Sequence, residues 1–388
     1  MNVNSVAVFL PCLLTGGTEV ATLETALALK SLGYNVDVIV YFAEVDAVML
    51  ETFQLSGFAL YLLGVKRVAG LRTHWILAIK LLRLLCCKSY KAIWVQYMTP
   101  TLLPLIMARL FTRHLITSVH VAASHYSPAG LQRLRWLACY WCDRSICVSQ
   151  TVATGILKVN DVMTRVFGRV VVIPNALDMT LVQAAVARDW RSDQAWSKDV
   201  VVLGFSGRLA HIKGADVLLQ ALALLHQQDM PVRLVVVGDG AEQSKLKALT
   251  QQLNIDAITH FAGRLPRSEI YGAIKGFDIA VVPSREEGFG LSALEAMAAG
   301  VPLVASRVDA LQEVVLDYVT GLLCEVDDPV SLDNALARLV RDVEFRHRLG
   351  AAGEAHATLF YDVSAYRARL ADLLRSMGLP VRSVRSPA

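Results

Sequence analysis

Short apolar runs that alternate with helical segments fill most of the chain, and this alternation restricts it to α/β folds. Between the first two runs, Val20, Leu23 and Leu27 recur at helical spacing, and Gly33 ends the helix. Buried strands separated by helices are typical of parallel sheets with helices on both faces. The strand-like runs are Val6–Leu10, Asn35–Tyr41, Ala92–Gln96, Leu115–His120, Arg144–Val148, Val170–Ile173, Val200–Ser206, Val232–Val237, Ile258–Phe261, Ile279–Val282, Pro302–Ala305 and Gly321–Cys324.

The alternation pauses in a polar stretch, residues 181–199, and then restarts. We therefore predict two facing, doubly wound Rossmann-like α/β domains, residues 1–180 and 200–360, joined by that linker. Residues 361–388 are expected to form a C-terminal helix, able to cross back to the N-terminal domain, and a loose tail. Ligands of such sheets gather beyond the carboxyl ends of the strands, so two facing edges would form a cleft.

Composition supports two packed domains and limits the partners. Of the 388 residues, 54% are hydrophobic and 19% are charged, which is ample for full cores and does not indicate disorder. The formal net charge of +4 is too small to indicate nucleic acid by itself. Residues 1–180 hold 16 Lys and Arg and 9 Asp and Glu, so the basic excess indicates an anionic partner for the N-terminal half.

The seven cysteines form no disulfide-like framework. Cys139 and Cys142, with Cys147 nearby, come closest to a metal motif, but a structural zinc site needs four suitably spaced ligands. Buried thiols on one helix face explain the pair better, and we expect no metal. The N-terminus lacks a basic region before its apolar run, and no uncharged stretch of about 18 apolar residues occurs. We therefore expect a cytosolic protein without a signal peptide or a transmembrane helix.

The strongest chemical motif is a glycine-rich loop between a predicted strand and a predicted helix, residues 281–295. Gly288 and Gly290 allow the backbone to approach a ligand closely, and the following helix N-terminus offers N–H groups suited to a phosphate. Glu287 precedes this anion site and Glu295 lies inside the helix. The two carboxylates can reach opposite sides of a bound diphosphate, where they suit sugar and ribose hydroxyls.

A second motif, Phe205–Gly214, also follows a strand and leads into a helix. Its two cations, Arg208 and Lys213, can neutralise a diphosphate both when it is bound and when it leaves. Each of these charges alone could equally be a solvated surface group. Their place in two glycine-containing strand–loop–helix motifs favours the functional interpretation.

These two motifs resemble the retaining glycosyltransferases of family four, of the bacterial surface-glycan type, which have the two-domain GT-B fold. The resemblance rests on Glu287-x7-Glu295 and on the Gly207-Arg208-Leu209…Lys213-Gly214 loop. Weaker matches follow in the family's order over residues 6–325, which makes the set specific. They are Gly16-Gly17-Thr18-Glu19, Val119-His120, Ile173-Pro174-Asn175 with Asp178, Val237-Gly238-Asp239-Gly240 and Phe261-Ala262-Gly263.

The resemblance implies a role for each matched residue of the C-terminal domain. Arg208 and Lys213 would hold the nucleotide diphosphate, and Glu295 would bind the ribose hydroxyls. Glu287 would bind a donor-sugar hydroxyl and stabilise positive charge near the anomeric carbon. The remaining matched positions would act through backbone: Gly288, Phe289, Gly290 and Leu291 would cradle the distal phosphate and the donor sugar, and Arg264 and Leu265 would meet the nucleobase.

For the N-terminal domain, the resemblance implies that His120 faces the donor sugar and acts with Glu287 in catalysis. Gly16 and Gly17 would let the first loop approach the diphosphate and the acceptor. No metal or other cofactor is implied, because cations and a helix dipole can stabilise the diphosphate charge in place of a metal. The donor would be a nucleotide sugar, with a UDP-sugar the first guess and GDP-mannose the second.

The implied reaction is transfer of a hexose-type sugar, with retention of configuration, to a hydroxyl of a saccharide or a lipid-linked glycan. Lipopolysaccharide, capsule or exopolysaccharide synthesis at the cytosolic membrane face is the expected setting, without nucleic acid. A catalytically silent GT-B-fold nucleotide-binding or scaffold protein and an inverting transferase are the alternatives. The segment Gly238-Asp239-Gly240 resembles the dinucleotide-binding motif of dehydrogenases. The indication is weak, because Gln243 stands where that motif needs a third glycine.

Residues 65–91 form an apolar, cationic and helical segment that allows two interpretations. Cations at Lys66, Arg67, Arg72, Lys80, Arg83 and Lys88, with Trp75 and Leu77 able to insert, would suit an anionic membrane surface. An ordinary helix packed on the first sheet, with snorkelling cations, would have the same composition. The sequence leaves both open.

Overall fold

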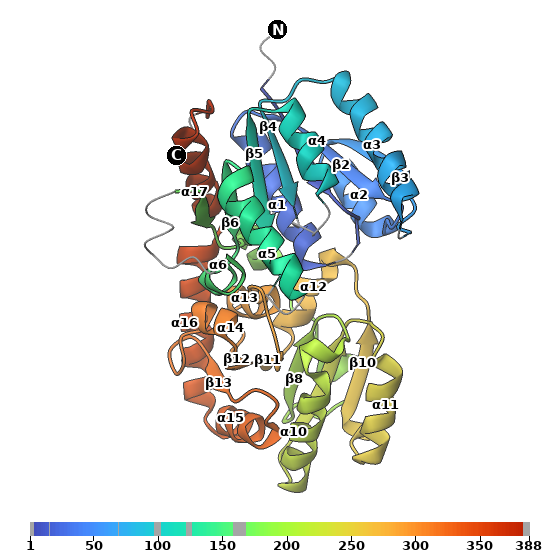
Figure 1. Ribbon diagram of the computed structural model, residues 1–388. Coiled ribbons are helices and arrows are strands. Elements are labelled where there is room, and N and C mark those ends of the chain that lie inside the picture. Colours follow the sequence, from blue (N-terminus) through green and yellow to red (C-terminus); the bar gives the residue numbers. More distant parts are fainter. Residues whose placement is uncertain are drawn as a thin grey trace. The chain divides into compact units, whose positions relative to one another are not determined.

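The chain forms two compact units, each described here by itself (Figure 1). Unit 1 comprises Met1–Ala176 together with Val363–Ala388, and unit 2 comprises Leu177–Asp362. The structure, a computed structural model, describes residues 4–14, 16–68, 70–96, 102–121, 126–157 and 168–382.

Unit 1 is built on a parallel sheet whose described part has seven strands in the order β3-β2-β1-β4-β5-β6-β7. The order reverses between β1 and β4, and the loops after these two strands flank the point where ligands of such sheets bind. The strands are β1 (Ser5–Leu10), β2 (Asn35–Phe42), β3 (Ala59–Val65), β4 (Ala92–Gln96), β5 (His114–Val119), β6 (Arg144–Cys147) and β7 (Val170–Val172).

Helices cover both faces of this sheet because its strands are apolar on both sides. Val6 and Val8 pack in one core with Leu23 and Leu29 of α1, whereas Phe9, from the opposite face, is also fully buried. The helical elements of unit 1 are α1 (Gly17–Ser31), α2 (Ala47–Leu55), α3 (Leu71–Cys86), α4 (Leu103–Phe111), α5 (Pro128–Trp136), the π-helical turn η2 (Leu137–Trp141), α6 (Gln150–Leu157) and α17 (Val363–Ser376).

Unit 2 repeats the plan with a six-stranded parallel sheet, in the order β10-β9-β8-β11-β12-β13. Its order reverses between β8 and β11. The strands are β8 (Val201–Ser206), β9 (Val232–Val237), β10 (Thr259–Gly263), β11 (Ile279–Val282), β12 (Leu303–Ser306) and β13 (Leu322–Cys324). The helical elements are α8 (Met179–Ala184), α9 (Trp190–Asp193), η3 (His211–Lys213), α10 (Ala215–Gln227), α11 (Gln243–Gln252), η4 (Asp256–Ile258), α12 (Arg267–Lys275), α13 (Leu291–Ala298), α14 (Asp309–Val314), α15 (Pro329–Arg341) and α16 (Val343–Tyr361).

The expected fold class of two doubly wound α/β domains is confirmed, and every strand expected from the sequence is present within two residues of its predicted ends. The sequence analysis missed β3, which pairs with β2 alone at the edge of its sheet. Most of its residues are partly or fully exposed, so it lacks the continuous apolar run that marks the central strands.

Two segments differ from the expectation. Residues 181–199, predicted as a linker, lie within unit 2, because Trp190 is fully buried and its indole donates to the carbonyl of Ala273 at 2.9 Å. The expected loose tail is packed as far as it is described. Leu379 is buried, and the Tyr34 hydroxyl donates to the Pro380 carbonyl at 2.5 Å. Residues 383–388 lie outside the described residues.

Within the described ranges, no helix is long and apolar enough to cross a membrane. The same part of the chain contains no group of three or more His, Cys, Asp or Glu that could hold a metal ion. Cys142 and Cys147 are buried free thiols, and burial raises the pKa of Cys142 to about 12. The side chain of Cys139 lies outside the described structure.

Candidate functional site

The two motif loops of unit 2 begin at neighbouring strands and contact one another. One loop follows β8 and contains Arg208 and Lys213; the other follows β11 and contains Glu287. Because β8 and β11 pair in parallel, both loops leave the carboxyl edge of the sheet where its order reverses. Chain topology thus brings together groups that lie about 75 residues apart in the sequence, at the place where such folds bind ligands.

A salt bridge joins the two loops. The Lys213 ammonium lies 2.5 Å from Oε1 of Glu287, and the Ser284 hydroxyl donates to the same oxygen at 2.8 Å. The Glu287 side chain is only 9% exposed, so removing Lys213 would leave a buried carboxylate without its cation. Lys213 keeps 21% of its side-chain surface exposed, from where it can also meet a ligand.

Glycine is required where the loops touch. A Cβ on Gly214 would lie 1.9 Å from the carbonyl oxygen of Pro283, which leads from β11 into the second loop. A Cβ on Gly290 would lie 2.4 Å from the Leu311 side chain, and Gly290 has a φ of +98°. Gly214 therefore excludes a larger residue because of the backbone clash, and Gly290 because of its positive φ. The close packing at Gly214 sets the position of Lys213 against Glu287.

Helix α13 begins directly after Gly290, and no side chain caps its first turn. The first N–H groups of a helix have no partner within the helix and carry its positive dipole end. Gly288 and Leu291 flank this N-terminus. Phe289 is buried, and its ring meets that of Tyr361 edge-on at 5.8 Å. A buried ring anchors the loop, while the amides of α13 offer a site for one phosphate group.

Glu295 lies in the second turn of α13, where protein surrounds its carboxyl although part of the residue stays exposed. Burial raises its pKa to about 7, while the charges of Arg267 and Lys213 act in the opposite direction. At neutral pH the carboxyl is therefore poised between a form that donates and a form that only accepts hydrogen bonds. The influence of Lys213 also shows that Glu295 and the Lys213–Glu287 pair share one site.

Arg208, Arg264 and Leu265 follow strands of the same sheet edge. Arg208 and Arg264 are exposed, and Leu265 is partly buried. A hydrogen bond of 2.8 Å from the Gly238 amide to the Gly263 carbonyl links the loops after β9 and β10. A Cβ on Gly238 would lie 1.9 Å from the carbonyl oxygen of the residue before Arg208. The structure therefore brings all the candidate loops of unit 2 to one continuous edge.

These contacts also explain the glycines of Gly238-Asp239-Gly240. Gly238 has a φ of +133° and Gly240 a φ of +157°, and a Cβ on Gly240 would lie 2.2 Å from the Leu209 carbonyl oxygen. The Leu209 amide donates to the Asp239 carbonyl at 2.7 Å. Packing against the β8 loop accounts for both glycines, so the segment gives no support to the dehydrogenase interpretation.

Arg285 is a structural residue of the site to which sequence reasoning gave no role. Its guanidinium binds both carboxylate oxygens of Asp216, at 2.9 and 2.7 Å, and lies 2.6 Å from Asp327. Burial favours a higher pKa for Asp216, but hydrogen bonds from Arg285 outweigh it and the pKa is lowered. Because Asp216 stands in the first turn of α10, this bidentate pair ties the two motif loops together. The sequence signal that could have identified Arg285 is its position between Ser284 and Glu287.

In unit 1, the first loop places Gly16 at the start of α1, beyond the end of β1. A Cβ on Gly16 would lie 2.8 Å from Oε2 of Glu19, so the Glu19 carboxylate folds back toward the loop. Glu19 is buried, and Gly17 is exposed on the first turn. The predicted glycines thus lie at the carboxyl edge of the unit 1 sheet.

His120 lies one residue beyond β5 at the same edge. Its Nε2 lies 2.7 Å from Oε1 of Gln96, the last residue of the neighbouring strand β4. Burial lowers the pKa of His120 to about 4, which makes the ring neutral at physiological pH. Within the described structure, Nδ1 of His120 and Nε2 of Gln96 are buried and have no hydrogen-bond partner. Gln96 escaped the sequence analysis because a polar residue ending an apolar strand has no distinctive motif.

Both halves of the chain match known glycosyltransferase families. Residues 15–181 match the family described as Glycosyltransferase Family 4, and residues 186–356 match the family described as Glycosyl transferases group 1. The D-inositol 3-phosphate glycosyltransferase of Corynebacterium urealyticum is 37% identical over 194 residues. That match covers 48% of this chain and 45% of the relative, so the chain spans about half the relative's length.

Solved structures resemble the chain over nearly its full length. HepE from Anabaena in complex with UDP has a TM-score of 0.81 and 21% identity, covering 96% of this chain and 100% of that chain. The same protein in complex with UDP and glucose has a TM-score of 0.81 and 22% identity, covering 96% of this chain and 99% of that chain. At these identities the likeness establishes the fold, which is that of the GT-B glycosyltransferases.

Proposed function

We propose that this chain, which carries a Glycosyltransferase Family 4 domain followed by a Glycosyl transferases group 1 domain, transfers a hexose-type sugar from a nucleoside-diphosphate sugar to a hydroxyl acceptor. The anomeric configuration of the donor is retained in this proposal. UDP-sugars are the preferred donors, with GDP-mannose second. Complexes of the structural neighbour HepE with UDP and with UDP and glucose support a nucleotide-sugar donor.

The observation that carries the proposal is the Lys213–Glu287 contact beside the uncapped N-terminus of α13. A cation and free helix amides suit the diphosphate of a nucleotide sugar, and a carboxylate next to them suits the sugar. Arg208 adds an exposed cation at the same edge, and Glu295 offers a carboxyl group to ribose hydroxyls. Together these groups suit the diphosphate, the sugar and the ribose of the donor.

In the proposed reaction, the bond between the anomeric carbon and the diphosphate oxygen breaks while the acceptor oxygen bonds to that carbon. Lys213, Arg208 and the α13 amides stabilise the negative charge that grows on the leaving diphosphate. The Glu287 carboxylate stabilises the positive charge that develops on the sugar ring. The acceptor's proton passes to the leaving phosphate, so that attack and departure occur on the same face of the sugar. Glu287 therefore has a stabilising role and not a nucleophilic one.

Two acceptor classes follow from different observations. The resemblance described from the sequence favours a saccharide or a lipid-linked glycan, as in lipopolysaccharide, capsule or exopolysaccharide synthesis. The name of the C. urealyticum relative favours an inositol phosphate as the second candidate. Both classes offer a hydroxyl on a polar ring, and inositol phosphate carries its phosphate directly on that ring. A release assay with each acceptor, read as free nucleotide, separates them.

We also propose that unit 1 associates with the membrane surface through α3. Its exposed face carries Leu71, Trp75, Ile79 and Leu82 at helical spacing, and Trp75 is 69% exposed. This face has the composition of an interfacial helix. Three exposed cations of α3 have no ion pair in the described structure: Arg72, Lys80 and Arg83. The exposed cations Lys66 and Arg67 lie in the connection that precedes the helix.

Two details of the expectation for residues 65–91 are wrong. Leu77 is 1% exposed and packs against the sheet, so it cannot insert into a bilayer. Lys88 is paired with Asp37 at 2.7 Å and also donates to the Tyr61 hydroxyl. Its charge is therefore neutralised within unit 1.

A binding screen with UDP, GDP and ADP tests the proposed activity. A ligand at 100 times its Kd stabilises the folded chain by about 2.7 kcal/mol, which a thermal melt detects. Absence of a shift with all three nucleotides would contradict the transferase proposal. Binding without turnover on any sugar nucleotide would instead favour the catalytically silent alternative. For an active enzyme, NMR of the product's anomeric centre distinguishes retention from inversion.

A further inference from the structure

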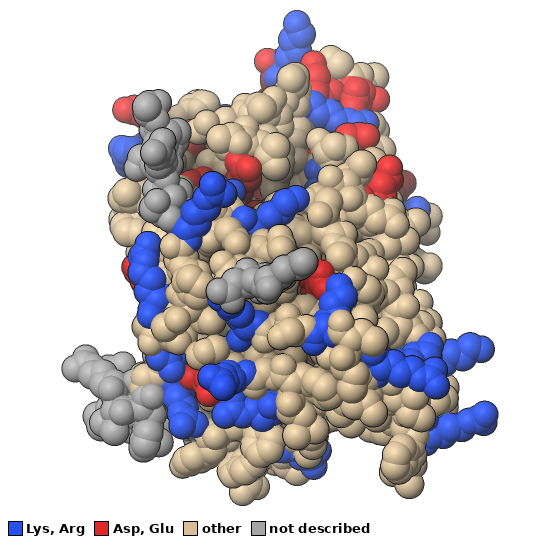
Figure 2. Space-filling model, turned by 90° about the horizontal axis from the view of Figure 1, so that it is seen from above, with Lys and Arg blue, Asp and Glu red and all other residues tan. Residues whose placement is uncertain are grey.

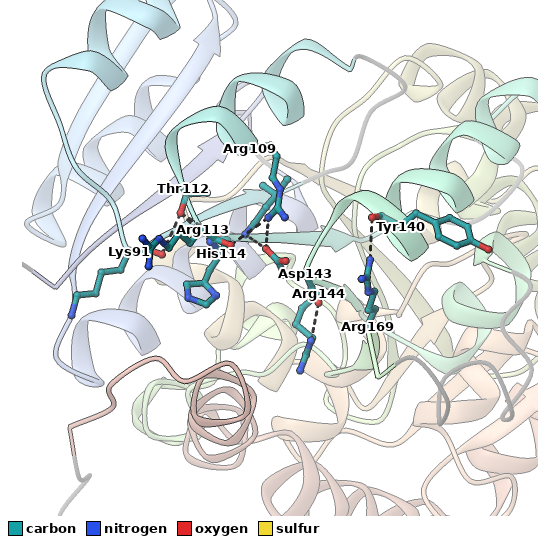
Figure 3. Close-up of polar contacts among 10 residues, drawn as sticks. Lys91, Arg109, Thr112, Arg113, His114, Tyr140, Asp143, Arg144 and Arg169 are labelled. Carbon is teal, nitrogen blue, oxygen red and sulfur yellow. Dashed lines mark hydrogen bonds and ion pairs between the residues drawn. The ribbon is translucent and has the colours of Figure 1, made fainter.

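A row of cations lies at the amino edge of the unit 1 sheet, opposite the edge that carries Gly16 and His120. Each of four neighbouring strands begins beside a basic residue (Figure 3). These residues are Lys91 before β4, Arg113 before β5, Arg144 at the start of β6 and Arg169 before β7. Neighbouring strands are about 4.8 Å apart, so the row extends over roughly 15 Å.

The contacts within this basic edge leave it strongly positive. Arg109, in the last turn of α4, pairs with Asp143 at 2.7 Å. Arg144 and Arg169 each donate to a backbone carbonyl, of Asp143 and Tyr140, at 2.9 and 3.0 Å. Carbonyls carry no net charge, and Arg109 already balances Asp143, so Lys91, Arg113 and Arg144 add three positive charges to this edge.

An ordinary explanation is that cations complement the negative ends of helices, which gather at the amino edge of such a sheet. That explanation fits Arg109, which donates to the Arg113 carbonyl at the end of α4. It does not fit the side chains of Lys91 and Arg113, which have no hydrogen-bond or ion-pair partner in the described structure. Arg113 is also exposed. The charge of these two groups is available to a partner.

Large apolar side chains flank the cations. Leu110, next to Arg109 on α4, is 71% exposed, and Tyr140, whose carbonyl binds Arg169, is 63% exposed. Viewed from above in Figure 2, blue Lys and Arg side chains extend across the middle of the molecule with few red ones among them. Cations mixed with exposed aliphatic and aromatic groups are typical of surfaces that meet a bilayer interface.

We propose that this basic edge is a second docking surface for an anionic phospholipid membrane, beside α3 and independent of the proposed catalytic function. Phosphate headgroups would lie against Lys91, Arg113 and Arg144, with Leu110 and Tyr140 at the level of the headgroups. The edge is continuous with α3, because only a short connection separates Cys86 from Lys91. Docking here leaves the opposite, carboxyl edge of the sheet open to substrates.

The test is vesicle co-sedimentation of the full chain at low salt. Vesicles of phosphatidylcholine are compared with vesicles that also contain phosphatidylglycerol. The edge variant combines Lys91→Gln, Arg113→Gln and Arg144→Gln, which spares Arg109 and Arg169. Each Lys or Arg near an anionic surface contributes roughly fivefold to binding, so the triple change should weaken it roughly a hundredfold. Raising the salt should weaken wild-type binding in the same direction.

Two variants that remove the same charge serve as controls. Lys66→Gln with Arg72→Gln and Arg83→Gln reports on α3, and Lys198→Gln with Lys245→Gln and Lys247→Gln reports on exposed cations of unit 2. Thermal melts and circular dichroism verify that each variant is folded. The proposal requires the edge variant to lose far more vesicle binding than the unit 2 control.

Four results would overturn the proposal. The folded edge variant could bind vesicles as tightly as wild type does, the edge and unit 2 variants could lose binding equally, or the α3 variant alone could lose it. The fourth is wild-type protein that ignores anionic vesicles but binds a single-stranded oligonucleotide through the same three cations. Failure of the transferase proposal would appear separately, as absent nucleotide binding, and would not affect vesicle binding.

Discussion

The first six strands of the unit 1 sheet have the same order as the six strands of unit 2, yet the polar groups at the two carboxyl edges differ in charge. In unit 2, the Lys213–Glu287 and Arg285–Asp216 pairs link charged groups across the two loops at the reversal point. In unit 1, the corresponding edge holds a neutral His120 against Gln96, with buried polar atoms that lack partners in the described structure. The fold fixes where a site lies in both units, and the loops decide its chemistry.

This difference indicates that the two edges suit different kinds of ligand group. A charged, internally paired edge is prepared for an anionic ligand, because cations and helix amides are held in place before the ligand arrives. The neutral His120–Gln96 pair, with unused hydrogen-bonding capacity, suits uncharged hydroxyl groups, which can complete those bonds. On the proposed function, unit 2 would bind the nucleoside diphosphate and unit 1 would contact sugar hydroxyls. The following predictions test this contrast.

The largest effect is expected for Lys213→Ala. The change removes the cation for the diphosphate and also leaves the Glu287 carboxylate buried without its partner. Loss of charge-assisted contacts of this kind costs about 3 kcal/mol, or roughly a hundredfold in donor affinity. Isothermal titration with UDP and with a UDP-sugar measures it. Lys245→Ala, at a lysine 77% exposed, is the control and should bind as wild type does.

Glu287→Gln should act on turnover more than on binding. The amide keeps the shape of the side chain but removes the negative charge that stabilises the developing positive charge on the sugar. We expect kcat to fall roughly thirtyfold, equivalent to about 2 kcal/mol, with a change in donor Kd below about threefold. Steady-state kinetics with a calorimetric Kd separate the two effects. A wild-type kcat would refute the assigned role, and Glu286→Gln serves as the neighbouring control.

Glu295→Gln should change the pH dependence of stability. Burial raises the pKa of Glu295 from 4.5 to about 7, so between these values the folded chain holds a proton that the unfolded chain releases. Stability from this group is present below pH 4.5 and is lost as the pH rises to about 7. Wild type should therefore lose about 3 kcal/mol of stability across this window relative to the variant.

Thermal melts between pH 4.5 and 8 measure that difference, with Glu344→Gln, at an exposed glutamate, as the control. Parallel curves for wild type and Glu295→Gln would contradict the pKa assignment. Binding of UDP by wild type should also strengthen as the pH rises through about 7, since the ionised carboxyl accepts hydrogen bonds from ribose hydroxyls more strongly.

The sequence predicted the features that depend on local pattern. The apolar runs identified the central strands, and the loop motifs identified Lys213 and Glu287 as candidate site residues. β3 and Gln96 were missed for a shared reason. An edge strand, and a polar residue at the end of a strand, can be recognised only from their neighbours in the folded structure. Arg285 likewise has a function only when Asp216, from the other loop, is beside it.

The sequence also misjudged segments whose burial depends on distant partners. Trp190 looked like part of a polar linker, yet its ring packs against Phe277, far along the chain. Leu77 and Trp75 had equal apolar character, and only the packing of α3 on unit 1 separates the buried residue from the exposed one. Local composition cannot assign such residues, because either face of a helix can be the inner one.

The smallest effect is expected in unit 1, for His120→Phe. Phenylalanine preserves the ring volume but removes both nitrogen atoms, including the buried Nδ1 that lacks a partner in the described structure. Loss of one neutral hydrogen bond to a sugar hydroxyl costs about 1 kcal/mol, or roughly fivefold in kcat/KM. Gln96→Leu is the matched control, because it removes the hydrogen-bond partner of Nε2 and leaves Nδ1 in place.

Because burial lowers the pKa of His120 to about 4, the ring stays neutral above about pH 5. The ratio of wild-type to variant kcat/KM should therefore be constant from pH 5 to 8. A ratio that fell toward unity at low pH would mean that the imidazole titrates in this range and that the His120–Gln96 pair is not neutral. A constant ratio here, beside a pH-dependent affinity for UDP in unit 2, would confirm that the same strand order carries two electrostatically different edges.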